Sequence, residues 1–331
     1  MKLHNPHDKF FKETFGNTEI AKDFLNNYLP QNIINIIDID TLQPQKDSFI
    51  NKELKESFSD LLFKVNINEN EGYIYLLFEH KSYVSDDIPL QLLKYMLEIW
   101  DSKTKKQKTM KLPIIIPLVI YQGKDNWNIK TSLGEIITNY ESLPQDIRQY
   151  VPNFKYLFYD ISTYTDEEIK GQVLLKMILE ISRDIFAEDN KRLLQTILKT
   201  AHYLRELANK QTSIEYFEVF IRYIFGARAD LTKKDMNDIV KKTKDTFLEG
   251  SEVIMTLAEQ LRAEGMEKGR AEGIEKGRAE GIEKGIEKGI EKGKLDIAKN
   301  MIKSNISIEQ IKILTGLPET KIKQLVQELK A

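Results

Sequence analysis

The sequence predicts an α/β fold with a mixed sheet flanked by helices, followed by an all-α C-terminal extension. Two apolar runs, 61–67 and 73–78, are separated by a polar break that ends in glycine, which is typical of a β-hairpin. A third run, 114–121, has the composition of a buried central strand, and 154–161 is a candidate for another. From about residue 165 onward the apolar residues recur at helical spacing, so we expect only helices there.

The composition limits the classes of protein that fit. The 331-residue chain is long enough for a full hydrophobic core and more than one structural unit. It contains no cysteine, which excludes disulfides and thiolate metal sites and fits a reducing compartment. No apolar run approaches about 18 residues, so we expect a cytoplasmic protein that does not bind a membrane. The net charge is −2, so any contact with DNA needs a local basic patch.

The N-terminal segment is expected to form an amphipathic helix over 8–28, where aromatic and aliphatic residues recur at helical spacing. Asp8 and Lys12 lie four residues apart on one face of this helix. Charge compensation at the helix start and a surface ion pair would explain both of them. The isoleucine-rich stretch 33–51 is expected to contain a short first strand.

Three ionisable residues, Asp60, Glu79 and Lys81, lie at the open end of the hairpin. Strand side chains alternate between the two faces of a sheet, so Glu79 and Lys81 share a face. The expected two-residue turn is Asn70–Glu71. With that turn, Asp60 lies opposite Lys81, diagonal to Glu79 and on the same face. A turn one residue longer would move Asp60 to the other face, so the prediction depends on the register.

Two carboxylates and a lysine at this spacing suit metal-assisted hydrolysis of a phosphodiester. Magnesium takes oxygen ligands from one or two carboxylates and keeps several waters. It lowers the pKa of a bound water and neutralises charge on the phosphoryl oxygens. Because 30% of the residues are charged, a solvated surface ion pair is the alternative interpretation of Glu79 and Lys81.

The next helix is expected to begin at Asp86–Pro89 and to bury one broad face. Gln91 and Tyr95 lie four residues apart on an adjoining face, where they could hold a substrate phosphate or a metal-bound water. Packing of a helix flank on the sheet explains them equally well. Five lysines follow within nine residues, and they are the best candidates for contacts to a DNA backbone, although a solvated loop has the same composition. These are Lys103, Lys105, Lys106, Lys108 and Lys111.

The pattern Asp60, Glu79-x-Lys81 resembles the PD-(D/E)XK nuclease superfamily. Ser59 stands where that superfamily often has proline. Four segments, in order over about the first half of the chain, resemble the Rpn family of recombination-promoting nucleases, which are also labelled transposase-like. These segments are HDKFFK at 7–12, EHKS at 79–82, PLQLLKYM at 89–96, and PLVIYQG at 117–123 with Trp127. The Gln-x-x-x-Tyr helix resembles the fourth motif of one nuclease subset.

The resemblance implies a restriction-endonuclease-like core and metal-dependent endonuclease cleavage of DNA that promotes recombination. DNA, and not a small molecule, would be the substrate, with magnesium as the cofactor and manganese or calcium as alternatives. The expected catalytic residues are Asp60 and Glu79 as metal ligands, Lys81 on the attacking water, and Gln91 as an assisting group. The expected supporting residues are His7, Asp8, Lys12 and Tyr95.

The chain is expected to continue after a nuclease core at 1–163 with a helical extension at 164–262 that carries no catalytic constellation. Residues 263–294 contain a glycine at every fourth position, eight in all. Glycine costs a helix about 1 kcal/mol relative to alanine, and each Glu–Lys pair contributes only about 0.2–0.5 kcal/mol. The repeat is therefore either a linker or a helix stabilised by close packing against a partner. We expect a helix in a homo-oligomer.

The last segment, 295–331, resembles a helix-turn-helix unit in which Ser307 caps a helix. The following helix begins with Pro318 and Glu319, which are poor residues for reading bases, so contact with protein is an equal alternative to contact with DNA. The whole chain also fits a second class of function. It could be a catalytically idle DNA-binding or assembly protein of a mobile element, in which the hairpin is structural and the tail drives oligomerisation.

Overall fold

The computed structural model describes residues 5–45, 59–79, 87–107, 111–124, 130–187, 189–228, 230–231 and 233–329. Two compact units divide the chain near residue 260. In the described parts of the chain, no helix has a stretch long and apolar enough to span a membrane.

A five-stranded mixed sheet forms the centre of the larger unit, with the strands in the spatial order β1-β2-β3-β4-β5. β2 runs antiparallel to both of its neighbours, β1 and β3, and β3, β4 and β5 run parallel to one another. The strands are β1 (Ile37–Pro44), β2 (Ser59–Ile67), β3 (Asn70–Glu79), β4 (Ile114–Tyr121) and β5 (Leu157–Asp160). The predicted mixed sheet, with its hairpin and its buried strand at 114–121, is thus confirmed.

The N-terminal segment forms two helices, α1 (Pro6–Phe15) and α2 (Thr18–Tyr28), so the prediction of one helix over 8–28 is wrong. Helix α1 ends before Gly16, where a Cβ would lie 2.3 Å from the backbone oxygen of Lys12. Asn17 then starts α2, because its side chain accepts a hydrogen bond from the Glu19 amide at 2.9 Å. A short helix, α3 (Gln31–Ile34), leads into β1.

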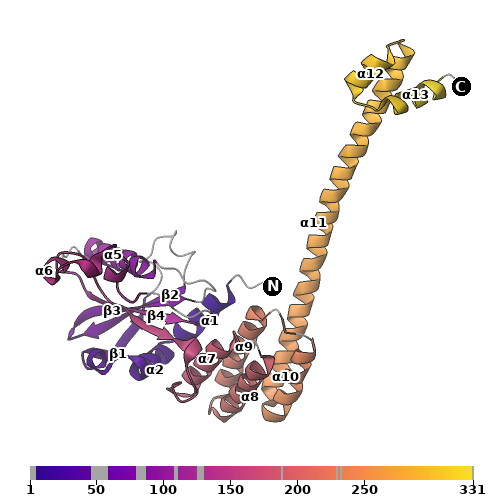
Figure 1. Ribbon diagram of the computed structural model, residues 1–331. Helices are drawn as coiled ribbons and strands as arrows, with labels where there is room; N and C mark the ends of the chain where they lie inside the picture. The colour runs from indigo at the N-terminus through magenta and orange to yellow at the C-terminus, as the bar shows by residue number, and fades with distance from the viewer. Residues whose placement is uncertain are drawn as a thin grey trace. The chain divides into compact units, whose positions relative to one another are not determined.

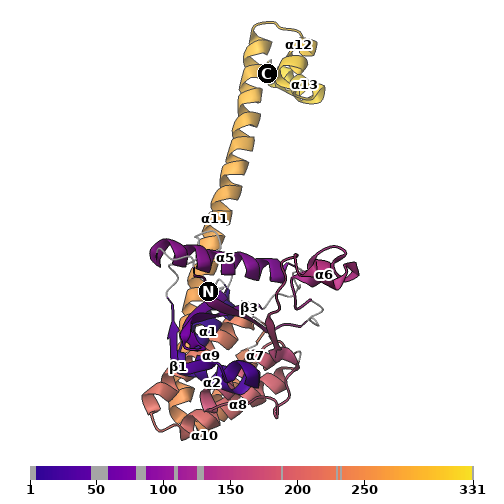
Figure 2. The ribbon, with the colours of Figure 1, turned by 90° about the vertical axis from the view of Figure 1, so that its left-hand side faces the viewer.

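Helices cover both faces of the sheet, with α5 (Ile88–Gln107) on one face and α1 and α2 on the other (Figures 1 and 2). On the α5 face, Tyr75 and Leu77 share a core cluster with Tyr95. On the other face, the Phe11 ring of α1 stacks on Phe78 with 4.3 Å between ring centroids. Since side chains alternate along β3, Glu79 at its end belongs to the α5 face.

From α7 onward the described chain forms only helices, as the apolar spacing predicted for the region after about residue 165, whereas short elements lie between β4 and α7. The short elements around β5 are η1 (Gly134–Ile136), η2 (Tyr140–Ser142), α6 (Gln145–Arg148) and η3 (Ile161–Thr163). The longer helices that follow are α7 (Val173–Asp184), α8 (Asn190–Glu206), α9 (Lys210–Ala227) and α10 (Lys233–Thr246).

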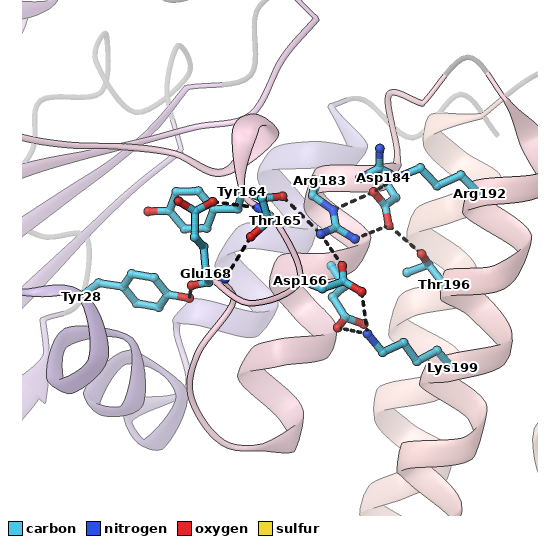
Figure 3. A network of polar contacts seen from close by, with 11 residues as sticks. Tyr28, Tyr164, Thr165, Asp166, Glu168, Arg183, Asp184, Arg192, Thr196 and Lys199 are labelled. Atoms are coloured by element: carbon cyan, nitrogen blue, oxygen red, sulfur yellow. Dashed lines mark hydrogen bonds and ion pairs between the residues drawn. The ribbon is translucent and has the colours of Figure 1, made fainter.

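A buried charge network joins α7 to α8 (Figure 3). Its centre is Asp184, which is 1% exposed and accepts hydrogen bonds from Arg183 at 2.8 Å and from Thr196 at 2.6 Å. Arg192 of α8 contacts the same carboxylate at 2.8 Å. Arg183 also donates to Asp166, at 2.7 Å, in the segment that precedes α7. The network therefore holds two helices and a connecting segment in one arrangement.

The C-terminal part consists of α11 (Leu248–Lys303), α12 (Ile308–Thr315) and α13 (Glu319–Glu328). The glycine repeat lies within α11 and is helical, while the expected homo-oligomer stays a prediction. The Gln310 amide donates to the Ser307 hydroxyl at 3.4 Å, so Ser307 caps α12 as predicted. The C-terminal end of α11 packs with α12 and α13 around a small core. Its buried members are Ala298, Ile311, Leu317, Ile322 and Leu325.

Candidate active site

The β2–β3 hairpin turns at Asn68–Glu69, two residues before the predicted position. Both turn residues have positive φ angles, 49° and 65°, which a two-residue type I′ turn requires. The register is therefore shifted by four residues, and Asp60 pairs with Leu77. The prediction that Asp60 lies opposite Lys81 is wrong.

The glycine of the polar break serves packing and not the turn. Gly72 lies inside β3, where a Cβ would lie 2.5 Å from the side chain of Ile67. Glycine at this position therefore leaves room for the Ile67 side chain to pack against β3 near the turn. Asparagine, which tolerates the left-handed region, supplies the first turn residue instead.

The corrected register keeps the two carboxylates on one face. A shift of four residues is even, so Asp60 remains on the face of Glu79. Glu79 lies two residues beyond Leu77, the partner of Asp60, and is therefore still diagonal to it, at about 7–8 Å by the usual sheet geometry. Asp60 is 8% exposed and Glu79 is 2% exposed. Two carboxylates on one face at this spacing offer oxygen donors that one divalent cation could bridge.

Two tyrosines lie beside these carboxylates. The Tyr75 hydroxyl, on β3, donates to Asp60 Oδ2 at 2.9 Å, and the Tyr75 ring lies 5.0 Å from the ring of Tyr95 on α5. Burial raises the pKa of Tyr75 well above its ordinary value, and the Asp60 carboxylate raises it further. Burial, and next the same carboxylate, also raise the pKa of Tyr95. Both phenols therefore keep their protons at neutral pH.

Helix α5 brings Gln91 to the same region. Gln91 lies one turn before Tyr95 and is 7% exposed. The predicted pair of Gln91 and Tyr95 therefore lies over the carboxylate face of the sheet. Lys81 lies outside the described residues, so its action on the attacking water stays a prediction.

His7 is joined to the end of β4 and to α9. Its Nδ1 lies 2.8 Å from the Tyr223 hydroxyl and 3.2 Å from Gln122 Nε2. Gln122 Nε2 donates to the Tyr223 hydroxyl at 2.6 Å, and the Gln122 backbone amide donates to the Glu79 backbone oxygen at 3.0 Å. The network thus links α1 and the helical extension to the backbone of Glu79.

The other two predicted supporting residues of α1 lie in different surroundings. Asp8 is in the first turn, where its side chain contacts that of Asn5 and its amide donates to Asn5 Oδ1 at 3.4 Å. Lys12 is exposed, one turn further on. Since α1 covers the Phe78 face of β3, both residues belong to the side of the sheet opposite the carboxylates.

Of the lysines proposed for DNA contact, Lys103 lies far from the carboxylates. Lys103 is only 8% exposed, and its Nζ contacts Glu71 at 2.9 Å near the turn end of the hairpin. Glu71 and Glu79 are eight residues apart on β3, which is roughly 26 Å at about 3.3 Å per residue. Lys105 pairs with Asp101 at 2.6 Å. Lys103 is therefore a buried lysine paired with a carboxylate, and its proposed contact with a DNA backbone stays a prediction.

The structure gives no contact with the carboxylates for the remaining lysines that it describes. Lys111 is exposed at the start of the segment that leads into β4. Lys108 and the side chain of Lys106 lie outside the described residues, so their predicted contacts with DNA remain predictions.

The carboxylates define what kind of metal could bind. Among the described residues, no group of three or more His, Cys, Asp or Glu side chains could hold a metal ion. Asp60 and Glu79 are a pair of oxygen donors, which fits an ion that takes one or two carboxylates and keeps waters, as magnesium does. Structural zinc sites use four protein ligands, and this pair supplies only two.

Sequence reasoning missed Tyr75, Gln122 and Tyr223. Tyr75 could have been found from the strand period, because it lies four residues before Glu79 and so on the same face. Gln122 and Tyr223 meet only in the folded chain, 101 residues apart, and the sequence carries no local signal for that contact.

Comparison of the sequence with known proteins identifies a family. A family model described as "Putative transposase, YhgA-like" matches residues 5–213, which include the whole sheet and α1 to α8. The chain belongs to this family. The match confirms the family that the four motif segments predicted, and it covers both Asp60 and Glu79.

Curated relatives of this YhgA-like protein extend the match to nearly the whole chain. Recombination-promoting nuclease RpnA of Escherichia coli K12 is 27% identical over 322 residues, 96% of each chain. RpnD of Escherichia coli O157:H7, with the same descriptive name, is 25% identical over 77% of this chain and 94% of its own. A relative named inactive, RpnE of strain K12, is 26% identical over 80% of this chain and 84% of its own. No solved structure matches the chain significantly.

Proposed function

We propose that this protein is a magnesium-dependent DNA endonuclease whose cleavage of phosphodiester bonds promotes recombination. The observation that carries the proposal is the pair of buried carboxylates, Asp60 and Glu79, on one face of the sheet at the open end of the β2–β3 hairpin. RpnA and RpnD, two relatives that are named recombination-promoting nucleases, support the same reaction class.

Asp60 and Glu79 would hold the metal, for which manganese and calcium are alternatives. When bound, the ion supplies an activated water and neutralises charge on the phosphoryl oxygens. Glu79 is suited to this role because its backbone is held against β4, where it pairs with Tyr121 and its carbonyl oxygen accepts a hydrogen bond from the Gln122 amide at 3.0 Å. Asp60 is suited because Tyr75 fixes one of its carboxylate oxygens.

The neighbouring groups would position the substrate. The Gln91 amide can donate to a phosphate oxygen, and Tyr95, with its raised pKa, stays a hydrogen-bond donor at neutral pH. Lys81 would orient or activate the attacking water, as the family resemblance implies. Apolar residues of α5 pack beside these groups and lower the local dielectric constant, which strengthens electrostatic interactions at the carboxylates.

A second proposal concerns self-association through α11. The repeat exposes isoleucines that lie four or eight residues apart, each more than half exposed. They are Ile274, Ile282, Ile286 and Ile290. The repeat glycines whose surroundings are described have no atom within 4 Å of an added Cβ, so a second helix could approach closely along them. Alternating Glu and Lys on the same helix are complementary to those of an antiparallel or staggered copy.

The alternative is a catalytically idle protein that binds DNA or only assembles. One observation favours it: RpnE and a further relative, YjiP of strain K12, are named inactive. A supercoiled plasmid incubated with the purified full chain separates the two proposals. The nuclease cuts with magnesium and not with EDTA, and Asp60→Ala abolishes cutting while DNA binding remains. An idle protein binds the plasmid and leaves it intact with magnesium, manganese or calcium.

A further inference from the structure

The hydroxyl of Tyr75 forms a buried contact with one of the two carboxylates. Tyr75 is completely buried, and its hydroxyl donates to Asp60 Oδ2 at 2.9 Å. Its ring is itself held by the ring of Tyr95, at 5.0 Å and tilted by 31°. The donor is therefore fixed in position by packing before any ligand arrives.

Asp60 needs such a contact because of its place in the fold. It is the second residue of β2, and its backbone pairs with Leu77 on one side of the strand. A carboxylate at a strand end can take several rotamers, and a hydrogen bond from a fixed donor selects one of them. Hydrogen-bonded partners behind metal ligands orient those ligands and tune their affinity.

We infer that Tyr75 is a positioning residue that orients the Asp60 carboxylate for a divalent cation. This inference rests on the proposed function, because it assumes that Asp60 is a metal ligand. It assigns Tyr75 a role that neither the nuclease motif nor the spacing of the ionisable residues identifies. Tyr75 acts through Asp60 and not on the substrate.

The same strand supplies a matched control. Tyr73 lies two residues earlier on the same face, is equally buried, and donates its hydroxyl to the Glu71 carboxylate at 2.8 Å. Tyr73→Phe and Tyr75→Phe therefore each remove one tyrosine-to-carboxylate hydrogen bond from β3. Only the second change affects a carboxylate of the candidate active site.

The test is calorimetric titration of the EDTA-treated full chain with Mn²⁺ and then Mg²⁺. Tyr75→Phe should weaken cation binding by about 10–100-fold, the usual effect of losing a partner behind a metal ligand. Tyr73→Phe should change the affinity by less than about threefold, since it does not touch a ligand. Thermal unfolding without metal should show similar midpoints for the two variants. The metal-activation curve for plasmid cleavage should shift to higher metal concentration for Tyr75→Phe alone.

The outcomes separate this inference from the proposed function. Equal cation affinity of Tyr75→Phe and the unaltered protein would overturn the positioning role and leave the nuclease proposal intact. An equal loss in both variants would also overturn it, because the effect would then come from general loosening of β3. If the unaltered protein binds neither cation, the metal-dependent function fails, and the role of Tyr75 fails with it.

Discussion

Replacing Asp184 with asparagine should destabilise the larger unit by about 3 kcal/mol. The Asp184 side chain is 1% exposed and that of Arg183 is 7% exposed, so the pair is shielded from water (Figure 3). Asparagine would turn an amide group toward two arginines and leave Arg183 without its buried counterion. Breaking a buried pair in this way costs about 3–5 kcal/mol. Arg183 keeps its contact with Asp166 at 2.7 Å, which places the estimate at the lower end.

Thermal unfolding followed by circular dichroism measures this change. For a unit of this size, each kcal/mol shifts the midpoint by about 2–4 °C, so we expect a fall of about 6–12 °C. Asp166→Asn is the control, because the Asp166 side chain is 59% exposed and an exposed pair contributes about 0–1 kcal/mol. If Asp184→Asn changes stability by less than about 1 kcal/mol, or if both variants lose equally, the assignment of Asp184 as the centre of the network is refuted.

Two further predictions concern Glu71 and the glycine repeat. Burial alone would raise the pKa of Glu71, but hydrogen bonds from two lysines and a tyrosine outweigh it and lower the pKa to about 2. Because this value lies below the ordinary 4.5, Glu71 stabilises the fold above pH 4.5 and loses that contribution as the pH falls toward 2. The difference in urea-unfolding free energy between the unaltered protein and Glu71→Gln should therefore shrink from pH 5 to pH 3, and a constant difference would contradict the assignment. In α11, Gly281→Ala with Gly285→Ala should stabilise the helix by about 1 kcal/mol each, seen in its thermal unfolding. The same double variant should weaken self-association in sedimentation experiments, and unchanged association would exclude close packing along these glycines.

The sequence predicted the parts of the fold that depend on local composition. The run at 114–121 is a strand, buried from Pro117 onward, because a series of β-branched and aliphatic residues broken only by Pro117 suits a strand covered on both faces. The glycine repeat is helical although glycine disfavours helices, and its Glu and Lys residues and its continuity with both ends of α11 agree with that outcome. The family was predicted from ordered motifs, and the family model confirmed it.

Other features depend on contacts that the sequence does not display. The hairpin turn was misplaced because Gly72 marks a close approach to Ile67 and not a turn. Asp60 and Glu79 nevertheless share a face, because an error of an even number of residues does not change side-chain direction. The burial of Lys103 was not predictable from the sequence, because the direction of α5 across the sheet, which brings this lysine to Glu71, is set by tertiary packing. The link from His7 through Gln122 to Tyr223 joins segments more than 100 residues apart.

Plasmid nicking by two matched glutamate variants tests the central claim most directly. Glu79 and Glu71 lie on the same face of β3 at opposite ends of the strand, so Glu79→Gln and Glu71→Gln are the same chemical change in two places. We predict that Glu79→Gln loses magnesium-dependent nicking by about 100-fold or more while retaining DNA binding, because it removes a carboxylate that neutralises and orients the cation. Glu71→Gln should cut at nearly the rate of the unaltered protein below its unfolding temperature. Full cutting by Glu79→Gln, or no cutting by the unaltered protein with magnesium or manganese, would contradict the account.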